Sequence, residues 1–459
     1  MVPSALVTDL YELTMMAGYD AGHVCGRATF ELFVRNLPPN RGYLVAGGLE
    51  QALQYLETLR FTPDQVAYLR QLPNMRGVQD RFFDETLPAL RFTGDVWAVP
   101  EGTPVFPNEP LLRVTAPLLE AQLVETALLA TVNFQTSIAS KAARIVWAAR
   151  GRAVMEFGGR RAHGPEAAVH AARAAYIAGC SSTSNVEAGF RFGIPLSGTM
   201  AHSWVTAFED EVEAFRQYAA VFGERSVFLI DTYDTVAAAR KIVQSGMRPS
   251  AVRLDSGDLV ALSLEVRAVL DAGGLHDTRI LASGDLDEWS VADLLAQGAP
   301  IDAFGVGTAL ATSKDAPALG GVYKLVEVER HGDHVPVMKL SASGKSSRPG
   351  RKQVWRLCRD GVATGDVIGL ADEPAPPGAA PLLTHVVERG FRVGAPVGLA
   401  ASRARCERML AELPLGVRLL EPREVYPVSG SAALEALTDQ TASALGVMTG
   451  RAAADYPKR

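Results

Sequence analysis

The chain has 459 residues, and its 45 Lys and Arg residues against 51 Asp and Glu residues give a net charge of −6. Apolar residues make up 48% and charged residues 21%, which is typical of a folded globular protein and unlike a disordered one. The length predicts two or three domains. Mild acidity without a basic run argues against a nucleic-acid partner, although a few local arginines would still bind a small anion.

Cysteine use and the N-terminal residues indicate the compartment. The four cysteines are too far apart for a CxxC motif, which favours a reducing environment. The N-terminal stretch has no basic region and reaches Asp9 and Glu12 early, so it is a poor signal peptide. No uncharged apolar run of about 18 residues occurs. We therefore expect a cytoplasmic protein without a membrane span.

Residues 1–117 mix helical and extended patterns. A helix is expected after Thr8, which suits a helix cap, and residues 28–37 alternate like a strand. Residues 94–117 are rich in β-formers but contain several prolines, which confine them to edge strands and turns. This part of the chain is predicted to be an α+β region.

A different rhythm occupies residues 118–320. Two helical stretches, about 118–132 and 134–150, come first, and then a short apolar strand, a polar loop and a helix repeat. Alternation of strands with helices predicts parallel β-α units. The strand and loop pieces are RAVMEFGGRRAHGP, AGCSSTSN, IPLSGTMAHSW, VFLIDTYDT, AVRLDSGD, RILASGDLDE and IDAFGVGTALAT.

Two architectures fit these units, an open doubly wound sheet and a closed barrel. In an open sheet the ligand groups gather at one switch point, whereas here nearly every strand ends in groups able to bind or catalyse. That distribution is typical of the C-terminal rim of a barrel. We therefore predict an irregular or incomplete β/α (TIM-like) barrel, with a second mixed α+β domain built from the N- and C-terminal parts.

The remaining residues, 321–459, become β-rich again. Hairpins are expected around Gly332 and Gly361, where turn residues separate two strand-like runs. A helix is expected over residues 401–413, and the Ala-rich residues 429–459 are expected to be a frayed tail. We predict that this C-terminal part packs with the N-terminal part.

Three successive strand ends, VRLDSGD, ASGD and FGVGT, carry Gly and Ser before a helix. Such turns let backbone N–H groups approach an anion, and two of them near the end of a barrel series form a phosphate site. The same residue types serve ordinary turns and helix caps, a role that suits Asp258 and Asp285. Three loops in a row, one with Arg253 just before Asp255, favour phosphate binding. These aspartates, like Asp231, also offer oxygens for magnesium or ribose hydroxyls.

Two further strand ends carry reactive or charged side chains. Arg160 and Arg161 suit phosphate or carboxylate, or else a solvent-exposed salt bridge, and Phe157 either stacks on a planar ring or fills the barrel end. His202 follows a glycine turn, three residues after Thr199. Histidine acts as acid, base, metal ligand or phosphoryl acceptor, and the residues alone leave these roles open.

Several motifs together resemble nicotinate phosphoribosyltransferase. They run in order from about residue 5 to about 360: TDLYELTM, FELFVRNLP, EFGGRRAHGPEAA, SGTMAHSWV, VRLDSGDL, GVGTALATS and GVYKLVE. The resemblance implies an enzyme that joins nicotinate to 5-phosphoribosyl 1-pyrophosphate (PRPP), giving nicotinate mononucleotide and pyrophosphate on the salvage route to NAD. It also implies ATP hydrolysis coupled through a phosphorylated histidine, a need for Mg²⁺, and a homodimer with the active site near the interface. Some relatives carry a cysteine cluster for zinc that Cys358 and Cys406 do not match, so no zinc is expected.

The resemblance also assigns roles to single residues. Tyr11 resembles the family's nicotinate-stacking tyrosine, and Thr199 and Arg253 resemble its nicotinate contacts, with Phe157 as a further one. His202 resembles the phosphorylated histidine, and Asp255 is expected to meet ribose or magnesium. Contacts with the PRPP phosphates are expected from Arg160, Arg161, Ser283, Gly284, Gly307 and Thr308.

Four other functions fit the sequence less well. A nicotinamide phosphoribosyltransferase is the alternative, but an amide substrate calls for a carboxylate or amide partner, whereas the arginines favour an acid. A quinolinate enzyme would need more basic residues for a second carboxylate. A lyase or aldolase of the Schiff-base type would need a lysine at a strand end, and none of the strand ends carries one. A non-catalytic binding module would be expected to lack His202 or Asp255.

Overall fold

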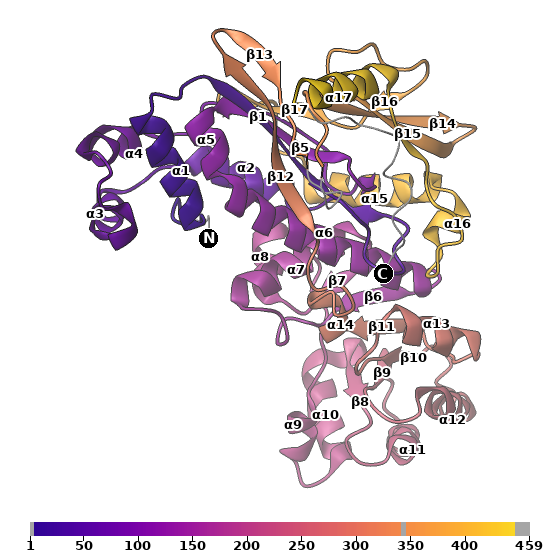
Figure 1. Cartoon of the computed structure of the whole chain (residues 1–459). Coiled ribbons are helices and arrows are strands. Elements are labelled where there is room, and N and C mark those ends of the chain that lie inside the picture. Colours follow the sequence, from indigo (N-terminus) through magenta and orange to yellow (C-terminus); the bar gives the residue numbers. More distant parts are fainter. Residues whose placement is uncertain (1–3, 341–345, 446–459) are drawn as a thin grey trace, which may run out of the picture. The chain divides into compact units, whose positions relative to one another are not determined.

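A computed structural model describes residues 4–340 and 346–445. The chain divides into two compact units (Figure 1). Unit 1 consists of Met1–Thr136 together with Ala318–Arg459, and unit 2 consists of Ser137–Pro317. Within the described ranges, none of the helices has the length and apolar character that crossing a membrane requires.

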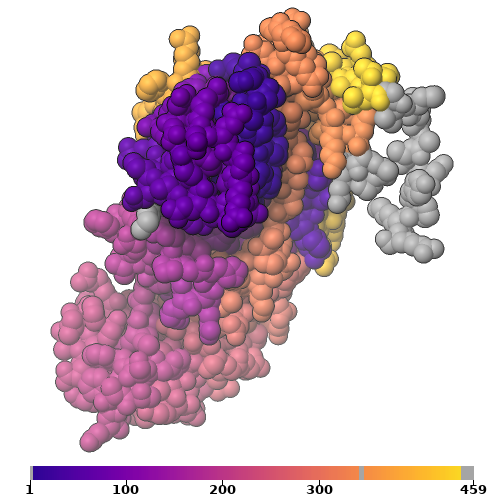
Figure 2. All heavy atoms as spheres, turned by 60° about the vertical axis from the view of Figure 1, so that its left-hand side comes forward, coloured from indigo at the N-terminus to yellow at the C-terminus, as the bar shows by residue number. Residues whose placement is uncertain are grey.

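The main sheet of unit 1 has seven strands in the order β13-β12-β1-β5-β3-β17-β18. Strand β1 (Arg27–Val34) is antiparallel to both β12 (Gly321–Arg330) and β5 (Pro110–Pro117). Figure 2 accordingly shows indigo residues from the start of the chain against orange residues from its last third. Both ends of the chain thus build one sheet. Its other strands are β3 (Asp95–Ala98), β13 (Asp333–Pro336), β17 (Thr384–Glu388) and β18 (Phe391–Arg392).

Strand β1 is buried on both faces, whereas the sequence predicted an alternating strand. The reason is that its polar positions face other protein: the buried Glu31 pairs with Lys352 Nζ at 2.9 Å. Helices add to the same apolar core, namely α1 (Leu10–Ala21), α2 (Leu49–Thr58), α5 (Leu118–Leu123) and the first turns of α6 (Glu125–Ala148). Helix α1 begins after Asp9 and not after Thr8, whose hydroxyl donates to the Glu12 carboxylate.

The C-terminal part of unit 1 forms a second sheet, in the order β16-β14-β15-β19. Its strands are β14 (Lys352–Arg359), β15 (Val362–Leu370), β16 (Ala380–Pro381) and β19 (Val428–Gly430). The hairpins predicted around Gly332 and Gly361 are confirmed as β12–β13 and β14–β15. The helix predicted at 401–413 is α15 (Leu399–Glu412).

The prediction of a frayed tail is wrong for the residues up to Leu445. Strand β19 pairs with β15, and α17 (Ala432–Ala444) follows it. Ser431 caps this helix by accepting a hydrogen bond from Leu434 N, and the Leu434 side chain is fully buried. The remainder of the predicted tail, 446–459, lies outside the described residues. The smaller elements of unit 1 are β2 (Leu44–Val45), α3 (Pro63–Gln71), η1 (Pro73–Met75), η2 (Phe82–Thr86), α4 (Leu87–Ala89), β4 (Pro104–Val105) and α16 (Leu415–Arg418).

Unit 2 contains a six-stranded sheet in the order β7-β6-β11-β10-β9-β8, and every pairing in it is parallel. The strands are β6 (Ala153–Glu156), β7 (Ser182–Thr183), β8 (Val227–Leu229), β9 (Ala251–Leu254), β10 (Arg279–Ala282) and β11 (Ala303–Val306). The IPLSG piece contributes only a single bridge, from Leu196 to Thr183. The predicted incomplete barrel, with a second mixed domain built from both ends of the chain, is confirmed.

Helices follow the strands of unit 2 as the β-α rhythm predicted (Figure 1). Asp258 caps one of them by accepting from Val260 N and Ala261 N. Asp285, the other expected cap, has a positive φ of 48°, and Asp287 caps the next helix instead. The elements are α7 (Pro165–Ile177), α8 (Val186–Phe192), α9 (His202–Thr206), α10 (Glu211–Phe222), η3 (Gly223–Arg225), α11 (Thr235–Ser245), α12 (Leu259–Ala272), α13 (Glu288–Ala296) and α14 (Thr308–Ala311).

Candidate active site

The carboxyl ends of the six parallel strands meet at one edge of unit 2, because parallel strands all point the same way. Most of the predicted site residues lie at or just beyond these ends. Thr199 and His202 come from the segment after α8 and reach the same edge through Arg253 and Asp231, whereas Tyr11 belongs to unit 1. The residues at this edge form two groups, which we call the charged half and the packed half of the rim. The charged half consists of Thr199, His202, Asp231, Arg253, Asp255 and Ser283, and the packed half consists of Glu156, Phe157, Gly158, Gly305 and Gly307.

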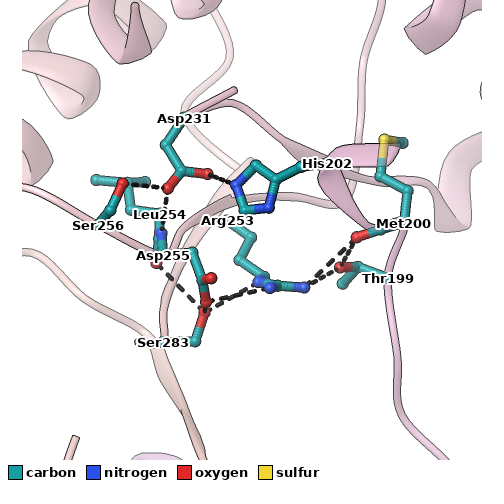
Figure 3. Close-up of polar contacts among 9 residues, drawn as sticks. All are labelled: Thr199, Met200, His202, Asp231, Arg253, Leu254, Asp255, Ser256 and Ser283. Atoms are coloured by element: carbon teal, nitrogen blue, oxygen red, sulfur yellow. Dashed lines mark hydrogen bonds and ion pairs between the residues drawn. The ribbon is translucent and has the colours of Figure 1, made fainter. Parts of the chain in front are cut away.

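Arg253, near the carboxyl end of strand β9, is the centre of the charged half (Figure 3). Its Nε donates to Ser283 Oγ at 2.9 Å, its Nη1 to Thr199 Oγ1 at 2.7 Å, and its Nη2 to Asp255 Oδ1 at 3.1 Å. A longer contact of 3.5 Å joins Nη1 to the Met200 carbonyl. Only 15% of the arginine side chain is exposed. The guanidinium is therefore fixed in one orientation with a cationic edge left at the rim.

Asp255 shares this network and stays ionised within it. Burial acts to raise the pKa of the carboxyl, but the hydrogen bond from Ser283 and the charge of Arg253 outweigh it, so the pKa lies below the usual value. Both contacts use Oδ1. The second oxygen, Oδ2, takes no part in them, and 28% of the side chain is exposed. Asp255 thus presents one anionic oxygen to a ligand.

His202 opens helix α9 and faces Asp231, which follows β8. His202 Nε2 lies 3.1 Å from Asp231 Oδ1, while Asp231 Oδ2 accepts from Ser256 Oγ at 2.6 Å and from Asp255 N at 3.2 Å. The aspartate side chain is 2% exposed and that of the histidine is 45% exposed. Asp231 therefore fixes the ring through Nε2, and Nδ1 takes no part in this contact (Figure 3).

Gly284 holds the ends of β9 and β10 together. Its φ of +92° is in the left-handed region, and a Cβ at this position would lie 1.9 Å from the Asp255 carbonyl oxygen. Only glycine allows such a close approach between the two backbones. The neighbouring Ser283 is buried, and its hydroxyl is already engaged with Asp255 and Arg253. Its side chain thus supports the charged half.

In the packed half, glycines let the Phe157–Gly158 turn pack closely against residues 305–307. Phe157 N donates to Val306 O at 2.8 Å, and a Cβ on Gly305 would lie 2.6 Å from the Phe157 ring. A Cβ on Gly307 would meet the Phe157 carbonyl oxygen at 3.3 Å, and one on Gly158 would meet Gly307 O at 2.7 Å. The same Cβ on Gly305 would lie 3.3 Å from Ser283 Cβ, so Gly305 joins the two halves. This packing fixes the Gly307–Thr308 turn.

The predicted arginine pair lies next to the packed half. Arg160 and Arg161 occupy the turn after β6, and both side chains are exposed. The turn is closed by a backbone hydrogen bond from Arg161 N to Gly158 O at 2.8 Å. The two side chains are thus available to an anion at this end of the rim, and their role stays a prediction.

Tyr11 belongs to helix α1 of unit 1 and has 45% of its surface exposed. Burial of the phenol and the nearby charge of Glu125 raise its pKa, so the hydroxyl is neutral. The ring is available for stacking, and its contact with nicotinate stays a prediction.

Three site residues were not recognised in their roles from the sequence. Asp231 was grouped with possible magnesium or ribose ligands, whereas its two oxygens are taken up by His202, Ser256 and the Asp255 backbone. Glu156 and Thr183 were not singled out. The sequence does contain a signal for Glu156, which is a glutamate at the end of an apolar strand. A carboxylate buried at such a position needs hydrogen-bond donors around it, and these indicate a structured site.

Comparison with known proteins assigns both units to one class. Residues 6–133 match the model of the nicotinate phosphoribosyltransferase N-terminal domain, and residues 138–316 match that of the quinolinate phosphoribosyl transferase C-terminal domain. The incomplete barrel with its polar rim is therefore that of a barrel-type phosphoribosyltransferase.

Individual relatives narrow the class. The chain is 46% identical over 436 residues to nicotinate phosphoribosyltransferase pncB2 of Mycobacterium tuberculosis, covering 93% of this chain and 91% of the relative. It is 48% identical over 381 residues to the Bacillus subtilis nicotinate phosphoribosyltransferase, covering 80% and 76%. The crystal structure of human nicotinic acid phosphoribosyltransferase superimposes with a TM-score of 0.82 at 31% identity, covering 94% of this chain and 99% of that one. The chain belongs to the nicotinate phosphoribosyltransferase family.

Proposed function

We propose that this protein transfers the phosphoribosyl group of PRPP to nicotinate, giving nicotinate mononucleotide and pyrophosphate in NAD salvage, and that ATP hydrolysis drives the reaction through a phosphorylated His202. The observation that carries the proposal is the fixed orientation of Arg253, held by Thr199, Ser283 and Asp255 next to the glycine turns. Family membership supports the same reaction.

Nicotinate is an anion, and Arg253 is the group best suited to bind its carboxylate. Of the guanidinium N–H groups, one on Nη2 is left over from the contacts with protein, and the 3.5 Å contact with Met200 is weak enough to be exchanged. The low exposure of the arginine strengthens a charge-assisted hydrogen bond to the ligand. An uncharged nicotinamide would gain less from this cation, so we expect the acid to be preferred.

The 5-phosphate of PRPP is assigned to the turns at Ser283–Gly284 and Gly307–Thr308. Glycine at both places leaves backbone N–H groups free of covering side chains, and such groups bind phosphate well. Arg160 and Arg161 would supply positive charge from the turn after β6. As the bond between ribose and pyrophosphate breaks, positive charge develops on the ribose, and the ionised Asp255 at the rim would stabilise it.

His202 is the proposed acceptor of the ATP γ-phosphoryl group. With Nε2–H directed at Asp231, the lone pair on Nδ1 attacks the γ-phosphorus, a P–N bond forms, and the bond to the β-phosphate oxygen breaks to release ADP. The buried Asp231 carboxylate stabilises the positive charge that the ring acquires, as an orienting aspartate does in other histidine dyads. Water then hydrolyses the P–N bond in each cycle.

Magnesium is expected to enter with the pyrophosphate group. In the part of the chain that the structure describes, no three His, Cys, Asp or Glu side chains gather into a metal site. Mg²⁺ is commonly held by one or two carboxylates and by substrate phosphates, and Asp255 Oδ2 is an oxygen of the right kind. When bound, the ion would neutralise charge on the leaving pyrophosphate.

A homodimer is proposed as the working form, with the active site near its interface. The support is the family resemblance and the exposed Tyr11 ring, which is open to stack on a nicotinate. Sedimentation of the purified protein gives the oligomeric state. Tyr11→Ala would raise the KM for nicotinate and leave the KM for PRPP unchanged.

The reaction itself is tested by incubating the protein with PRPP and Mg²⁺, with nicotinate or nicotinamide, and with or without ATP. We expect the mononucleotide from nicotinate, stimulated by ATP, and equal turnover of nicotinamide would contradict the role of Arg253. ATP labelled in the γ position is expected to label His202, in an alkali-stable, acid-labile form. His202→Ala should lose the label and the ATP stimulation while retaining some product, because positioning of the substrates remains. Label retained in that variant would exclude His202.

A further inference from the structure

We infer that Glu156 is a positioning residue, which holds the Phe157–Gly158 turn and through it the Gly307–Thr308 turn in the geometry needed for substrates. The inference rests on the proposed function. Glu156 ends strand β6, and its side chain is 1% exposed. It contacts neither Arg253 nor His202, so the chemistry proposed above makes no use of it.

Two hydrogen-bond donors converge on this carboxylate from different elements. Gly158 N donates to Oε1 at 2.5 Å, and Thr183 Oγ1 of β7 donates to Oε2 at 2.6 Å. A carboxylate is the side chain that offers an acceptor at both of its terminal atoms. The main chain reinforces the contact, since Ser184 N donates to the Glu156 carbonyl at 2.9 Å. Glu156 thus joins the ends of β6 and β7.

The burial of this charge is expensive for the fold. Within the described residues, no charged side chain pairs with Glu156, and burial raises the pKa of its carboxyl despite the hydrogen bonds from Thr183 and Gly158. An apolar side chain of similar size would avoid this penalty. Groups that lower stability in this way are typical of functional positions. A role confined to stability therefore does not account for Glu156.

Glu156 acts on the substrate site through its hydrogen bond with Gly158 N. This residue has no room for a side chain, because a Cβ would lie 2.3 Å from Ala311 Cβ and 2.7 Å from Gly307 O. Pulling Gly158 N towards Glu156 therefore presses the turn against Gly307. The same turn carries the Phe157 ring on Gly305. Without the Glu156 carboxylate, both the Gly307–Thr308 turn and the Phe157 ring lose this support.

Three variants test this role, in the full-length protein. Glu156→Leu removes both acceptors, and we expect it to fold and to lose on the order of 100-fold in kcat/KM for PRPP and for nicotinate, as small misplacements of substrate do. Glu156→Gln keeps an acceptor for Gly158 N and is expected to recover most of this loss. The preference for nicotinate over nicotinamide should not change in either variant, because Arg253 is untouched.

Thr183→Val is the variant that keeps the test valid if Glu156→Leu does not fold. It removes the hydroxyl that donates to Glu156 and that also accepts from Asn185 N, with little change in shape, and we expect a smaller loss in the same two constants. Ser181→Ala is its matched control, since the Ser181 hydroxyl binds the Val154 carbonyl, away from Glu156. Wild-type kinetics in a folded Glu156→Leu or in Thr183→Val would overturn the inference, as would equal losses in Glu156→Gln and Glu156→Leu. Failure of the proposed function looks different, because the wild type itself would then form no mononucleotide.

Discussion

The two halves of the rim in unit 2 are held in place by different forces. In the charged half, Arg253 and Asp231 fix their neighbours by charge-assisted hydrogen bonds between side chains. In the packed half, glycines allow close packing: a Cβ on Gly158 or Gly305 would clash with its neighbours, and one on Gly307 would require a small shift. The difference matches the two tasks proposed for the rim: a group that binds a carboxylate or carries a phosphoryl group needs an oriented charge, whereas a turn that cradles a phosphate needs bare backbone.

Gly284→Ala is expected to have the largest effect, because it separates the two strand ends that carry the charged half. The new Cβ would lie 1.9 Å from the Asp255 carbonyl oxygen, so the two strand ends must separate. We expect PRPP binding to be lost and the free energy of unfolding to fall by at least about 3 kcal/mol. Calorimetric titration with PRPP and urea unfolding measure the two effects.

Gly298→Ala is the matched control for Gly284→Ala. Gly298 has a similar left-handed backbone, with φ of +78°, but nothing lies within 4 Å of a Cβ there. Both variants carry the cost of placing alanine in that conformation, and only the first meets a neighbouring backbone. Equal effects of the two variants would show that the close approach does not matter.

Arg253→Ala breaks the charged half alone. It removes the proposed partner of the nicotinate carboxylate and leaves Asp255 without its cation, so we expect a loss of about 2–5 kcal/mol in transition-state stabilisation for nicotinate. The ratio of kcat/KM values for nicotinate and nicotinamide should fall. Arg216→Ala, on the exposed pair with Glu213, is the control and should leave that ratio unchanged.

Gly307 tests the packed half with a graded series. A Cβ here would lie 3.3 Å from the Phe157 carbonyl oxygen, which requires a shift of only a few tenths of an ångström. Gly307→Ala is therefore expected to weaken PRPP binding by about tenfold, or about 1.4 kcal/mol. Gly307→Val, with two further methyl groups over the turn, should abolish it without unfolding the chain. Unchanged affinity in the valine variant would rule out this turn as the phosphate site.

The smallest effects concern pH, where the two halves should behave in opposite ways. The pKa of Asp255 is lowered, so the stability it contributes is present above about pH 3.9, the ordinary aspartate value, and is lost as the pH falls through its folded-state pKa. The pKa of Glu156 is raised, so its ionised form costs stability as the pH rises from about 4.3, the ordinary glutamate value, through its folded-state pKa.

Urea unfolding of the wild type, Asp255→Asn and Glu156→Gln across this range measures both trends. The stability advantage of the wild type over Asp255→Asn should grow with rising pH. Its advantage over Glu156→Gln should shrink over the same interval. If the stability differences for the two variants changed with pH in the same direction, the two halves would not differ electrostatically as proposed.

The barrel rim was predictable because β-α units repeat in the sequence and each strand ends in polar residues. That pattern alone predicts Arg253, Asp255 and Ser283 at one edge of a sheet. Pairings across the rim were not predictable, because the bond between His202 and Asp231 joins two different strand ends. The same holds for Glu156 and Thr183, which meet only once β6 and β7 lie side by side.

Two predictions from local sequence patterns were wrong, and each for a physical reason. Residues 28–37 alternate, yet β1 is buried on both faces because Glu31 finds Lys352 in a distant part of the sequence. An Ala-rich stretch looked like a frayed tail, but Leu434 anchors it as helix α17. In both cases the deciding contact is made by residues far apart in the chain, and no local signal reports it.

The pairing of β1 with β12 has a consequence for how the chain is made on the ribosome. All of unit 2 lies between these two strands in the sequence, so its parallel sheet can fold before β12 has been made. During that interval β1 lacks its neighbour β12 and β3 lacks its neighbour β17, and exposed strand edges attract other chains. Nascent chains released before β12 emerges should therefore aggregate through unit 1 and still contain the folded sheet of unit 2.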